Sequence, residues 1–319
     1  MVFLARLTRE SMRKEIAFAA SALLLFLCPG IDARAVLSQG TEVRVVVTAE
    51  PKRGKTIPEL FAEDLRVTQN REKRQITSLE SLNGSKLQLL LLIDDSAARS
   101  FDTQISALKD FVMALPGNAE VAVGYMHNGM AQMTSQFTLD HAAAAATIRL
   151  ADGPGGGDVS PYDSLTDALK KWPKTAAPRR EVVMISSGIE GLGGGYAPEN
   201  PYVDAGIESA QKAGVTVYNI YCPSAGHAGH SFWQSTSGQN FLSQLADETG
   251  GESYALLLGS AVSFEPYLKA ILEAQQHQYL LGFLARPHAK AGLQPVHVSV
   301  LEKDASVTAA DKVFVPAQK

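Results

Sequence analysis

Apolar and polar residues follow two patterns along the chain, and the changes between them divide it into three parts. Short alternating segments rich in β-branched residues occur near the start, at Val43–Thr48, Leu65–Thr68 and Gln75–Leu79, and again after residue 278. Such segments predict strands. Between residues 85 and 277, continuous apolar runs alternate with segments whose apolar residues recur every three or four positions. This middle pattern predicts strands covered on both faces, each followed by a helix.

The middle part therefore resolves into a series of expected elements. The expected strands are Gln88–Ile93, Glu120–Met126, Met130–Thr138, Glu181–Ile185, Val215–Tyr221 and Glu252–Leu256. The expected helices are Ser100–Leu115, His141–Leu150, Pro161–Trp172, Tyr202–Ala213, Gln239–Glu248 and Phe264–Gln276, with a long polar loop at Pro223–Gly238. Repeated strand–helix units favour an α/β fold with a doubly wound, mostly parallel sheet. The two flanks are expected to form a small β module beside it.

The first 35 residues have the pattern of an export signal. A basic segment ending at Lys14 precedes the apolar run Ile16–Leu27, and small residues suited to cleavage follow at Ala33–Ala35. The run is short for a membrane span, so a cleaved signal is expected, with an uncleaved anchor as the alternative. We expect a signal peptide at 1–35, an N-terminal β module at 36–84, the α/β domain at 85–277 and a C-terminal β segment at 278–319, in a secreted or periplasmic protein.

Composition and charge narrow the class of partner. The 319 residues are 45% hydrophobic and 19% charged, which suits a globular protein with a large core. Removing residues 1–35 leaves 24 basic and 30 acidic groups, a net charge of −6, which disfavours a nucleic-acid partner. No later segment is long enough to span a membrane. Cys28 leaves with the signal, so Cys222 remains alone and is expected to be a small buried apolar residue.

Polar residues follow three of the expected strands. The loops are Asp94–Arg99 in "LLLLIDDSAARS", Gly155–Tyr162 in "GGGDVSPYDSLTDAL" and Ser186–Gly195 after "EVVMI". In an open α/β sheet, ligand sites lie at the carboxyl ends of the strands. We therefore expect these loops to meet at one edge of the sheet. Asp95 is expected to point away from Asp94, because neighbours in extended backbone face opposite sides.

In order and spacing, these three loops resemble the motifs of von Willebrand factor A (VWFA) domains, in particular bacterial secreted VWFA-related proteins. The flanking segments "GKTIPELFAEDLRVTQNREKRQI" and "QYLLGFLARP" add to the resemblance, which covers most of the chain after the signal. It implies a doubly wound fold that carries Mg²⁺ at the top of the sheet, held by oxygens from the three loops. An acidic group of a partner would complete the ligand shell, since Mg²⁺ takes six oxygen ligands.

The metal motif is degenerate in this chain. Asp94 and Ser96 match the first aspartate and first serine of the motif, but Ala98 stands in place of the second serine and Ser187 in place of the third-loop aspartate. The second loop lacks the threonine of the motif, so Asp158 or Ser160 would have to serve. We expect a metal-free corner in which Asp94 and Ser96 bond to loop amides and cap the first helix. The alternative is a rearranged Mg²⁺ site made by Asp94, Ser96, Asp158 and Ser160.

Enzymatic interpretations rest on weaker patterns. Ser186-Ser187-Gly188 follows a strand but lacks the leading glycine of the Gly-x-Ser-x-Gly nucleophile motif. His227 and His230 have a spacing that suits a metal, yet structural zinc needs four ligands. A hydrolase using the rim of Asp94, Ser187 and Asp158, or the two histidines, stays an alternative. A structural envelope protein without a ligand site is another.

The interpretation that fits these patterns best is an exported, non-enzymatic protein–protein interaction module without a cofactor. Its unknown protein partner is expected to bind the loops at the carboxyl end of the sheet, with Ser187, Phe232 and Trp233 as the binding residues. The adjacent aromatic residues Phe232 and Trp233 lie among polar residues. They fit either an exposed binding hot spot or a plug into the core.

Overall fold

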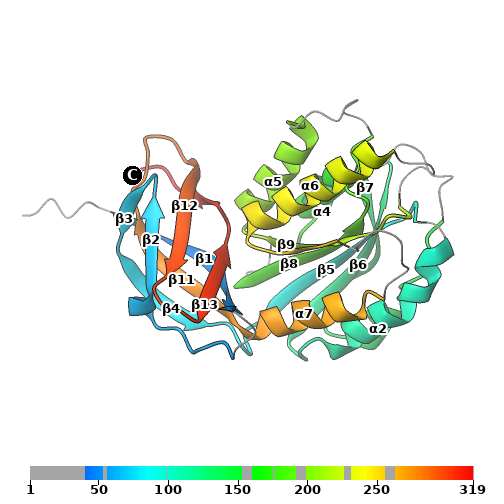
Figure 1. Ribbon diagram of the computed structural model, residues 1–319, viewed down its shortest axis with the longest axis horizontal. Helices are drawn as coiled ribbons and strands as arrows, with labels where there is room; N and C mark the ends of the chain where they lie inside the picture. Colours follow the sequence, from blue (N-terminus) through cyan, green and yellow to red (C-terminus); the bar gives the residue numbers. More distant parts are fainter. Residues whose placement is uncertain are drawn as a thin grey trace, which may run out of the picture. The chain divides into compact units, whose positions relative to one another are not determined.

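The computed structural model describes residues 40–52, 56–97, 99–152, 160–174, 177–191, 199–225, 231–255 and 263–318. The expected signal peptide at 1–35 lies outside the described residues. Gly40–Lys319 form one compact unit built around three sheets (Figure 1). Within the described ranges, no helix has the length and apolar character needed to cross a bilayer.

The central sheet has six strands in the order β10-β9-β8-β5-β6-β7. All neighbours are parallel except β7, which pairs antiparallel with β6 through a turn with positive φ at Asn128 and Gly129. The predicted fold class, a doubly wound and mostly parallel sheet with a small β module, is confirmed. The strands are β5 Leu87–Asp94, β6 Ala119–His127, β7 Met130–Thr138, β8 Arg179–Ser186, β9 Thr216–Tyr221 and β10 Ser253–Tyr254.

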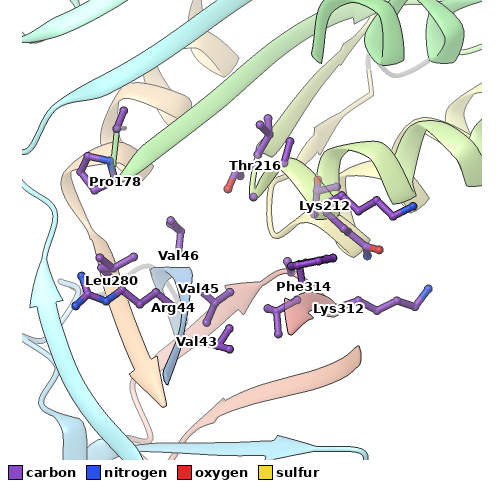
Figure 2. Close-up of a pocket in the computed structure, with 18 residues that line it drawn as sticks. Val43, Arg44, Val45, Val46, Pro178, Lys212, Thr216, Leu280, Lys312 and Phe314 are labelled. Carbon is purple, nitrogen blue, oxygen red and sulfur yellow. The ribbon is translucent and has the colours of Figure 1, made fainter. Parts of the chain in front are cut away.

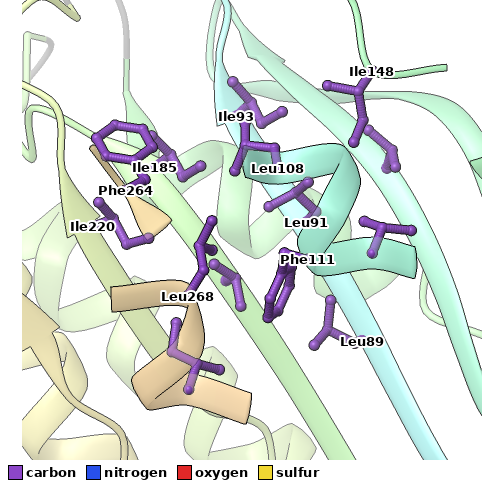
Figure 3. Packing of buried hydrophobic residues seen from close by; sticks show 14 of the residues in the cluster. Leu89, Leu91, Ile93, Leu108, Phe111, Ile148, Ile185, Ile220, Phe264 and Leu268 are labelled. Carbon is purple, nitrogen blue, oxygen red and sulfur yellow. The ribbon is translucent and has the colours of Figure 1, made fainter. Parts of the chain in front are cut away.

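Helices cover both faces of this sheet. Alternate residues of β5 enter different cores: Leu89 and Leu91 pack under α2 and α7, whereas Leu90 and Leu92 pack under α4, α5 and α6 (Figures 1 and 3). Burial on both faces explains the continuous apolar run of β5, every residue of which is buried. The helices are α2 Ile105–Ala114, α3 His141–Ala146, α4 Pro161–Lys170, α5 Pro201–Ala213, α6 Phe232–Thr249 and α7 Glu265–Gln276.

The flanks of the chain form a β sandwich of two four-stranded sheets, ordered β13-β1-β11-β4 and β14-β12-β2-β3. Valines of β1, β2, β12 and β14 and Phe283 of β11 fill the core between the sheets. The N-terminal strand β1 lies between the C-terminal strands β11 and β13, so the two flanks complete one another. The strands are β1 Thr41–Pro51, β2 Leu65–Gln69, β3 Glu72–Arg74, β4 Ile76–Ser81, β11 Gln278–Ala285, β12 Gly292–Val300, β13 Ala305–Ala309 and β14 Lys312–Val315.

Three predicted elements of the middle part differ from the structure. The helix expected at Ser100–Leu115 begins as a 3-10 turn, Arg99–Gln104, and becomes α-helical only at Ile105. The helix expected at His141–Leu150 ends at Ala146, because the backbone N–H and C=O of Arg149 both bond to the Tyr125 hydroxyl. The polar loop expected at Pro223–Gly238 is shorter, because α6 already begins at Phe232.

A buried polar network lies where the central sheet meets the sandwich. The guanidinium of Arg179, at the start of β8, is buried and donates to the carbonyl oxygens of Gln275 (2.8 Å) and Ser85 (3.1 Å). It also donates to the side-chain oxygen of Gln278 at 3.2 Å, and the Gln278 amide donates to the Tyr218 hydroxyl at 3.2 Å. Strands β8 and β9 are thereby tied to the junction of α7 with β11.

Candidate functional site

Asp94 occupies the corner where β5 ends, and its carboxylate is buried. One carboxylate oxygen accepts from the amide (3.1 Å) and the hydroxyl (2.5 Å) of Ser96. The other accepts from the hydroxyl of Ser186, the last residue of β8, at 3.0 Å. Burial raises the pKa of Asp94, the hydrogen bonds from Ser96 and Ser186 oppose that rise, and the charge of Asp95 adds to it. No cation faces this carboxylate among the described residues.

The predicted bonding of Asp94 to a loop amide is therefore present, but neither Asp94 nor Ser96 is the N-cap of α2. Helix α2 has Gln104 at its N-cap position and no side-chain cap bond, because the intervening 3-10 turn delays the start of the helix far beyond Asp94. Ser186 was expected in the third loop but was not named among the site residues. The Ser-Ser-Gly sequence could have indicated this role, since its first serine is the last residue of β8 and lies as close to the corner as the second.

Asp95 points to a different set of partners from Asp94, as expected for adjacent residues. Its carboxylate receives two hydrogen bonds from the Arg149 guanidinium, at 2.7 and 2.8 Å, and one from the Asp152 amide at 3.1 Å. His127 Nδ1 lies 3.9 Å away. Burial alone would raise the pKa of Asp95, but the bonds and charges of Arg149, the Asp152 amide and His127 outweigh it and lower the pKa. The guanidinium also lies 4.1 Å from the Tyr125 ring centroid, which fixes this ion pair further.

The third loop packs tightly against α6. Gly188 has φ +68°, and a Cβ atom there would lie 2.3 Å from the Gly238 carbonyl oxygen. A Cβ atom at Gly238 would in turn lie 2.3 Å from the Ser187 carbonyl oxygen. The buried Tyr162 hydroxyl donates to the Gly188 carbonyl at 3.0 Å. The Ser187 side chain is buried, and its hydroxyl accepts from the Ile189 amide at 3.4 Å.

Ser160 begins α4 and serves as its N-cap. Its hydroxyl accepts from the Asp163 amide at 3.2 Å and donates to the Glu190 carboxylate at 2.6 Å. Ser160 is fully buried and Glu190 is 8% exposed. Glu190 was missed by the sequence reasoning, and no pattern in the sequence marks it. The Ser160–Glu190 bond ties the start of α4 to the third loop.

Phe232 and Trp233 lie in the first turn of α6 and are 66% and 70% exposed. Their rings meet edge to face with centroids 5.8 Å apart. A capping box fixes this turn: the Ser231 hydroxyl accepts from the Gln234 amide, and the Gln234 side chain accepts from the Ser231 amide. Of the two interpretations left open by the sequence, a core plug is therefore wrong, because both rings face solvent.

The remaining candidates are a buried cysteine and several residues that lie outside the described ranges. Cys222 is buried directly after β9, as expected, and burial raises the pKa of its thiol, so it is protonated at neutral pH. Its sulfur lies 3.3 Å from the Ser224 hydroxyl. Asp158, His227 and His230 lie outside the described residues, as does Ala98.

The described residues bring few oxygen donors to this corner. Across the ranges that the structure describes, no three carboxylate, histidine or cysteine side chains gather where they could hold a metal. Among the described residues of the corner, the Asp95 carboxylate is paired with Arg149, the Asp94 carboxylate has no cation beside it, and the third-loop position holds the neutral Ser187. Mg²⁺ requires hard oxygen ligands in near-octahedral geometry, and protein sites generally supply charge through one or two carboxylates. The Ser160 hydroxyl already donates to the Glu190 carboxylate and accepts from the Asp163 amide at the start of α4.

Comparison with known proteins gives remote structural likenesses. Neither a protein-family model nor a curated protein matches the sequence. The BatB protein of Bacteroides thetaiotaomicron is similar at 14% identity, with a TM-score of 0.43 over 59% of this chain and 96% of that one. The ArnB paralog VWA2 of Sulfolobus acidocaldarius is similar at 12% identity, with a TM-score of 0.40 over 88% of this chain and 76% of that one. The pilus tip protein Mfa5 of Porphyromonas gingivalis is similar at 12% identity, with a TM-score of 0.44 over 86% and 66%.

The two tryptophans of the chain are expected to report the exposure of the aromatic pair. Trp172 donates to Gln88 at 3.0 Å and packs on Phe137, whereas Trp233 is 70% exposed. In Trp172→Phe, the remaining Trp233 emission should be red-shifted and several-fold more sensitive to acrylamide than the Trp172 emission of Trp233→Phe. Equal quenching in the two variants would contradict the exposed position of Trp233.

Proposed function

We propose that this chain is an exported, VWFA-related protein-recognition module that binds a protein partner through the rim at the carboxyl ends of β5, β8 and β9, without a metal ion and without catalysis. The observation that carries the proposal is the aromatic pair Phe232 and Trp233. Two large, exposed rings held in a capped helical turn offer much apolar area to a partner at a low cost in conformational entropy. Tryptophan in particular is enriched among residues that dominate binding energy.

The position of the pair links it to the rim. Gly238, further along α6 from the two rings, touches the Ser187–Gly188 backbone. The first turn of α6 therefore projects from the same edge of the sheet that carries Asp94 and Ser187. A partner that covers the two rings would extend over the third loop.

The chemistry of the corner supports binding rather than catalysis. The Ser160 and Ser187 hydroxyls are buried, and the bonds described for them are to backbone amides or to Glu190. The Cys222 thiol is buried and its pKa is raised. A nucleophile needs a general base and access to substrate, and none of these three groups has both among the described residues.

A site-specific crosslink tests the proposed surface. A photoreactive phenylalanine analogue placed at position 233 should crosslink to a discrete partner in the exported protein fraction of the source organism. The same analogue at Phe61, which is 54% exposed on the sandwich, is the matched control and should not give that product. Phe232→Ala should weaken the partner's binding at least about tenfold, as expected for a hot-spot residue. Equal products from positions 61 and 233, or none from either, would contradict the proposal.

A calorimetric titration tests the metal-free corner. Protein treated with EDTA should show no saturable micromolar binding of Mg²⁺ or Mn²⁺, since Asp95 is paired with Arg149 and both oxygens of Asp94 already accept hydrogen bonds from Ser96 and Ser186. Asp94→Ala should give the same flat trace. Micromolar binding that disappears in Asp94→Ala would instead support the rearranged site that includes Asp158.

A further inference from the structure

A cavity of about 530 Å³ lies between the sandwich and the central α/β part, away from the rim (Figure 2). Its walls come from β1, from β14 and from the segment that joins α5 to β9. The volume is in the range of small-molecule and peptide sites. The apolar part of the wall includes Val43, Val45, Leu280, Val215 and Phe314.

Strand β1 presents an open edge to this cavity. Strand β13 pairs with β1 only from Val47 to Pro51, so residues 42–46 have no strand partner on that side among the described residues. The Ala49 amide donates to the carbonyl of His277, the residue before β11. In this register, the odd-numbered residues of β1 direct their backbone N–H and C=O groups toward β11. Backbone groups alternate along an antiparallel strand, so the N–H and C=O of Arg44 and Val46 point to the open side.

Strand β14 presents a second open edge. Within the described ranges, it lies at the end of its sheet and pairs with β12 alone. The Val296 amide donates to the Asp311 carbonyl at 2.7 Å, so the odd-numbered residues of β14 direct their backbone N–H and C=O groups toward β12. The N–H and C=O of Lys312 and Phe314 therefore point away from β12. Two unpaired strand edges thus flank one cavity, an arrangement that extended peptides complete by adding a strand.

The cavity also carries a buried acceptor and three cations. Gln211, 4% exposed, lines the cavity and donates its side-chain N–H to the Glu248 carbonyl, but its side-chain oxygen has no hydrogen-bond partner among the residues that the structure describes. The charged residues of the described lining are Arg44, Lys212 and Lys312, and no carboxylate is among those lining residues. Their own carboxylate partners, Glu42, Glu208 and Glu248, lie outside it. Figure 2 shows the Lys212 and Lys312 side chains pointing the same way and that of Arg44 the other way.

We propose that this cavity is a second binding site, which takes an extended, acidic segment of a partner protein as an added strand on the open edge of β1. The partner backbone would pair with Arg44 and Val46, a backbone N–H would satisfy the Gln211 oxygen, and apolar side chains would fill the valine-lined wall. Carboxylates of the segment would meet Lys212 and Lys312. This site is independent of the aromatic pair at the rim.

The test uses a displayed library of random octapeptides, panned on the full chain, with the enriched peptides then synthesised. Peptides with alternating apolar residues and at least one Asp or Glu should be enriched. Binding should protect the Arg44 and Val46 amides from hydrogen exchange, which in the free protein exchange faster than the Val45 and Val47 amides. No enrichment above background, or protection elsewhere on the chain, would overturn the proposal.

Variants of the open edge show whether the peptides bind to β1. Val46→Pro removes an outward N–H without breaking a bond to β11, and should weaken peptide binding at least tenfold. Ser81→Pro, on the open edge of β4, is the matched control and should leave peptide binding unchanged. A double charge reversal, K212E/K312E, should also weaken binding of the acidic peptides, whereas Trp233→Ala should not.

Self-association is the competing use of an open edge. If light scattering shows a dimer of the free chain that Val46→Pro converts to a monomer, the edge belongs to a second copy and the peptide proposal is overturned. If the wild type and Val46→Pro are both monomers, and only Val46→Pro and K212E/K312E lose peptide binding, the peptide proposal is supported.

Discussion

Gly188→Ala is expected to lower the free energy of unfolding by about 2–5 kcal/mol. Gly188 has φ +68°, a conformation that costs a residue with a Cβ atom roughly 1–2 kcal/mol. The added Cβ would also lie 2.3 Å from the Gly238 carbonyl oxygen and 2.5 Å from Leu242 Cγ, and overpacking of this kind typically costs a further 1–3 kcal/mol. Urea denaturation followed by far-UV circular dichroism measures the loss.

Gly84→Ala is the matched control for this prediction. Gly84 has φ +77°, but a Cβ atom there would have nothing within 4 Å. It should therefore show only the conformational cost, about 1–2 kcal/mol. The difference between the two variants isolates the contact of the third loop with α6. Equal losses would show that α6 moves aside freely and that the contact does not hold the helix.

Gly238→Ala is expected to destabilise the protein, opposite to the usual effect of alanine within a helix. Inside a helix, alanine is normally more favourable than glycine by about 1 kcal/mol. Here the Cβ would lie 2.3 Å from the Ser187 carbonyl oxygen, so the substitution should destabilise the protein instead. Because α6 carries Phe232 and Trp233, both variants should also weaken binding at the rim while leaving the cavity beside β1 unaffected.

The sequence was most informative where one local rule decides the structure. The continuous apolar run of β5 is buried on both faces, Ser160 and Pro161 begin α4, and Gly214 ends α5 with φ +62°. Each of these follows from residues adjacent in the chain. The start of α6 was missed although Ser231 and Gln234 have the spacing of a capping box, because the two turns that follow are rich in Ser, Thr, Gly and Gln and lack an apolar face toward the core.

The corner depends on contacts between distant residues, and the sequence could not supply these. Asp95 pairs with Arg149 and Ser160 with Glu190, across 54 and 30 positions of the chain. Local pattern showed that Asp94, Ser96 and Ser187 lie near one edge of the sheet. It could not show that a cation neutralises the Asp95 carboxylate, whereas the Asp94 carboxylate is held by hydroxyl groups and a backbone amide.

Asp94 and Asp95, adjacent at that corner, are expected to affect stability with opposite dependence on pH. The pKa of Asp95 is lowered in the folded state, so its contribution is present above the unfolded-state pKa of about 3.9 and is lost as the pH falls through the folded-state value. At pH 7, Asp95→Asn should cost about 1–3 kcal/mol. This figure is below the usual cost of breaking a buried pair, because the Arg149 side chain is 37% exposed and water can solvate it.

For Asp94 the sign is reversed, because burial raises its pKa in the folded state. Its contribution is present below about pH 3.9 and is lost as the pH rises through the folded-state value. Asp94→Asn keeps an acceptor for Ser96 and removes the buried charge, so at pH 7 it should be at least as stable as the wild type, and near pH 3 it should equal it. Urea unfolding of the wild type and both variants from pH 3 to pH 8 measures this. If Asp94→Asn were the more damaging variant at pH 7, a cation would have to stabilise the Asp94 carboxylate, and the metal-free corner would be wrong.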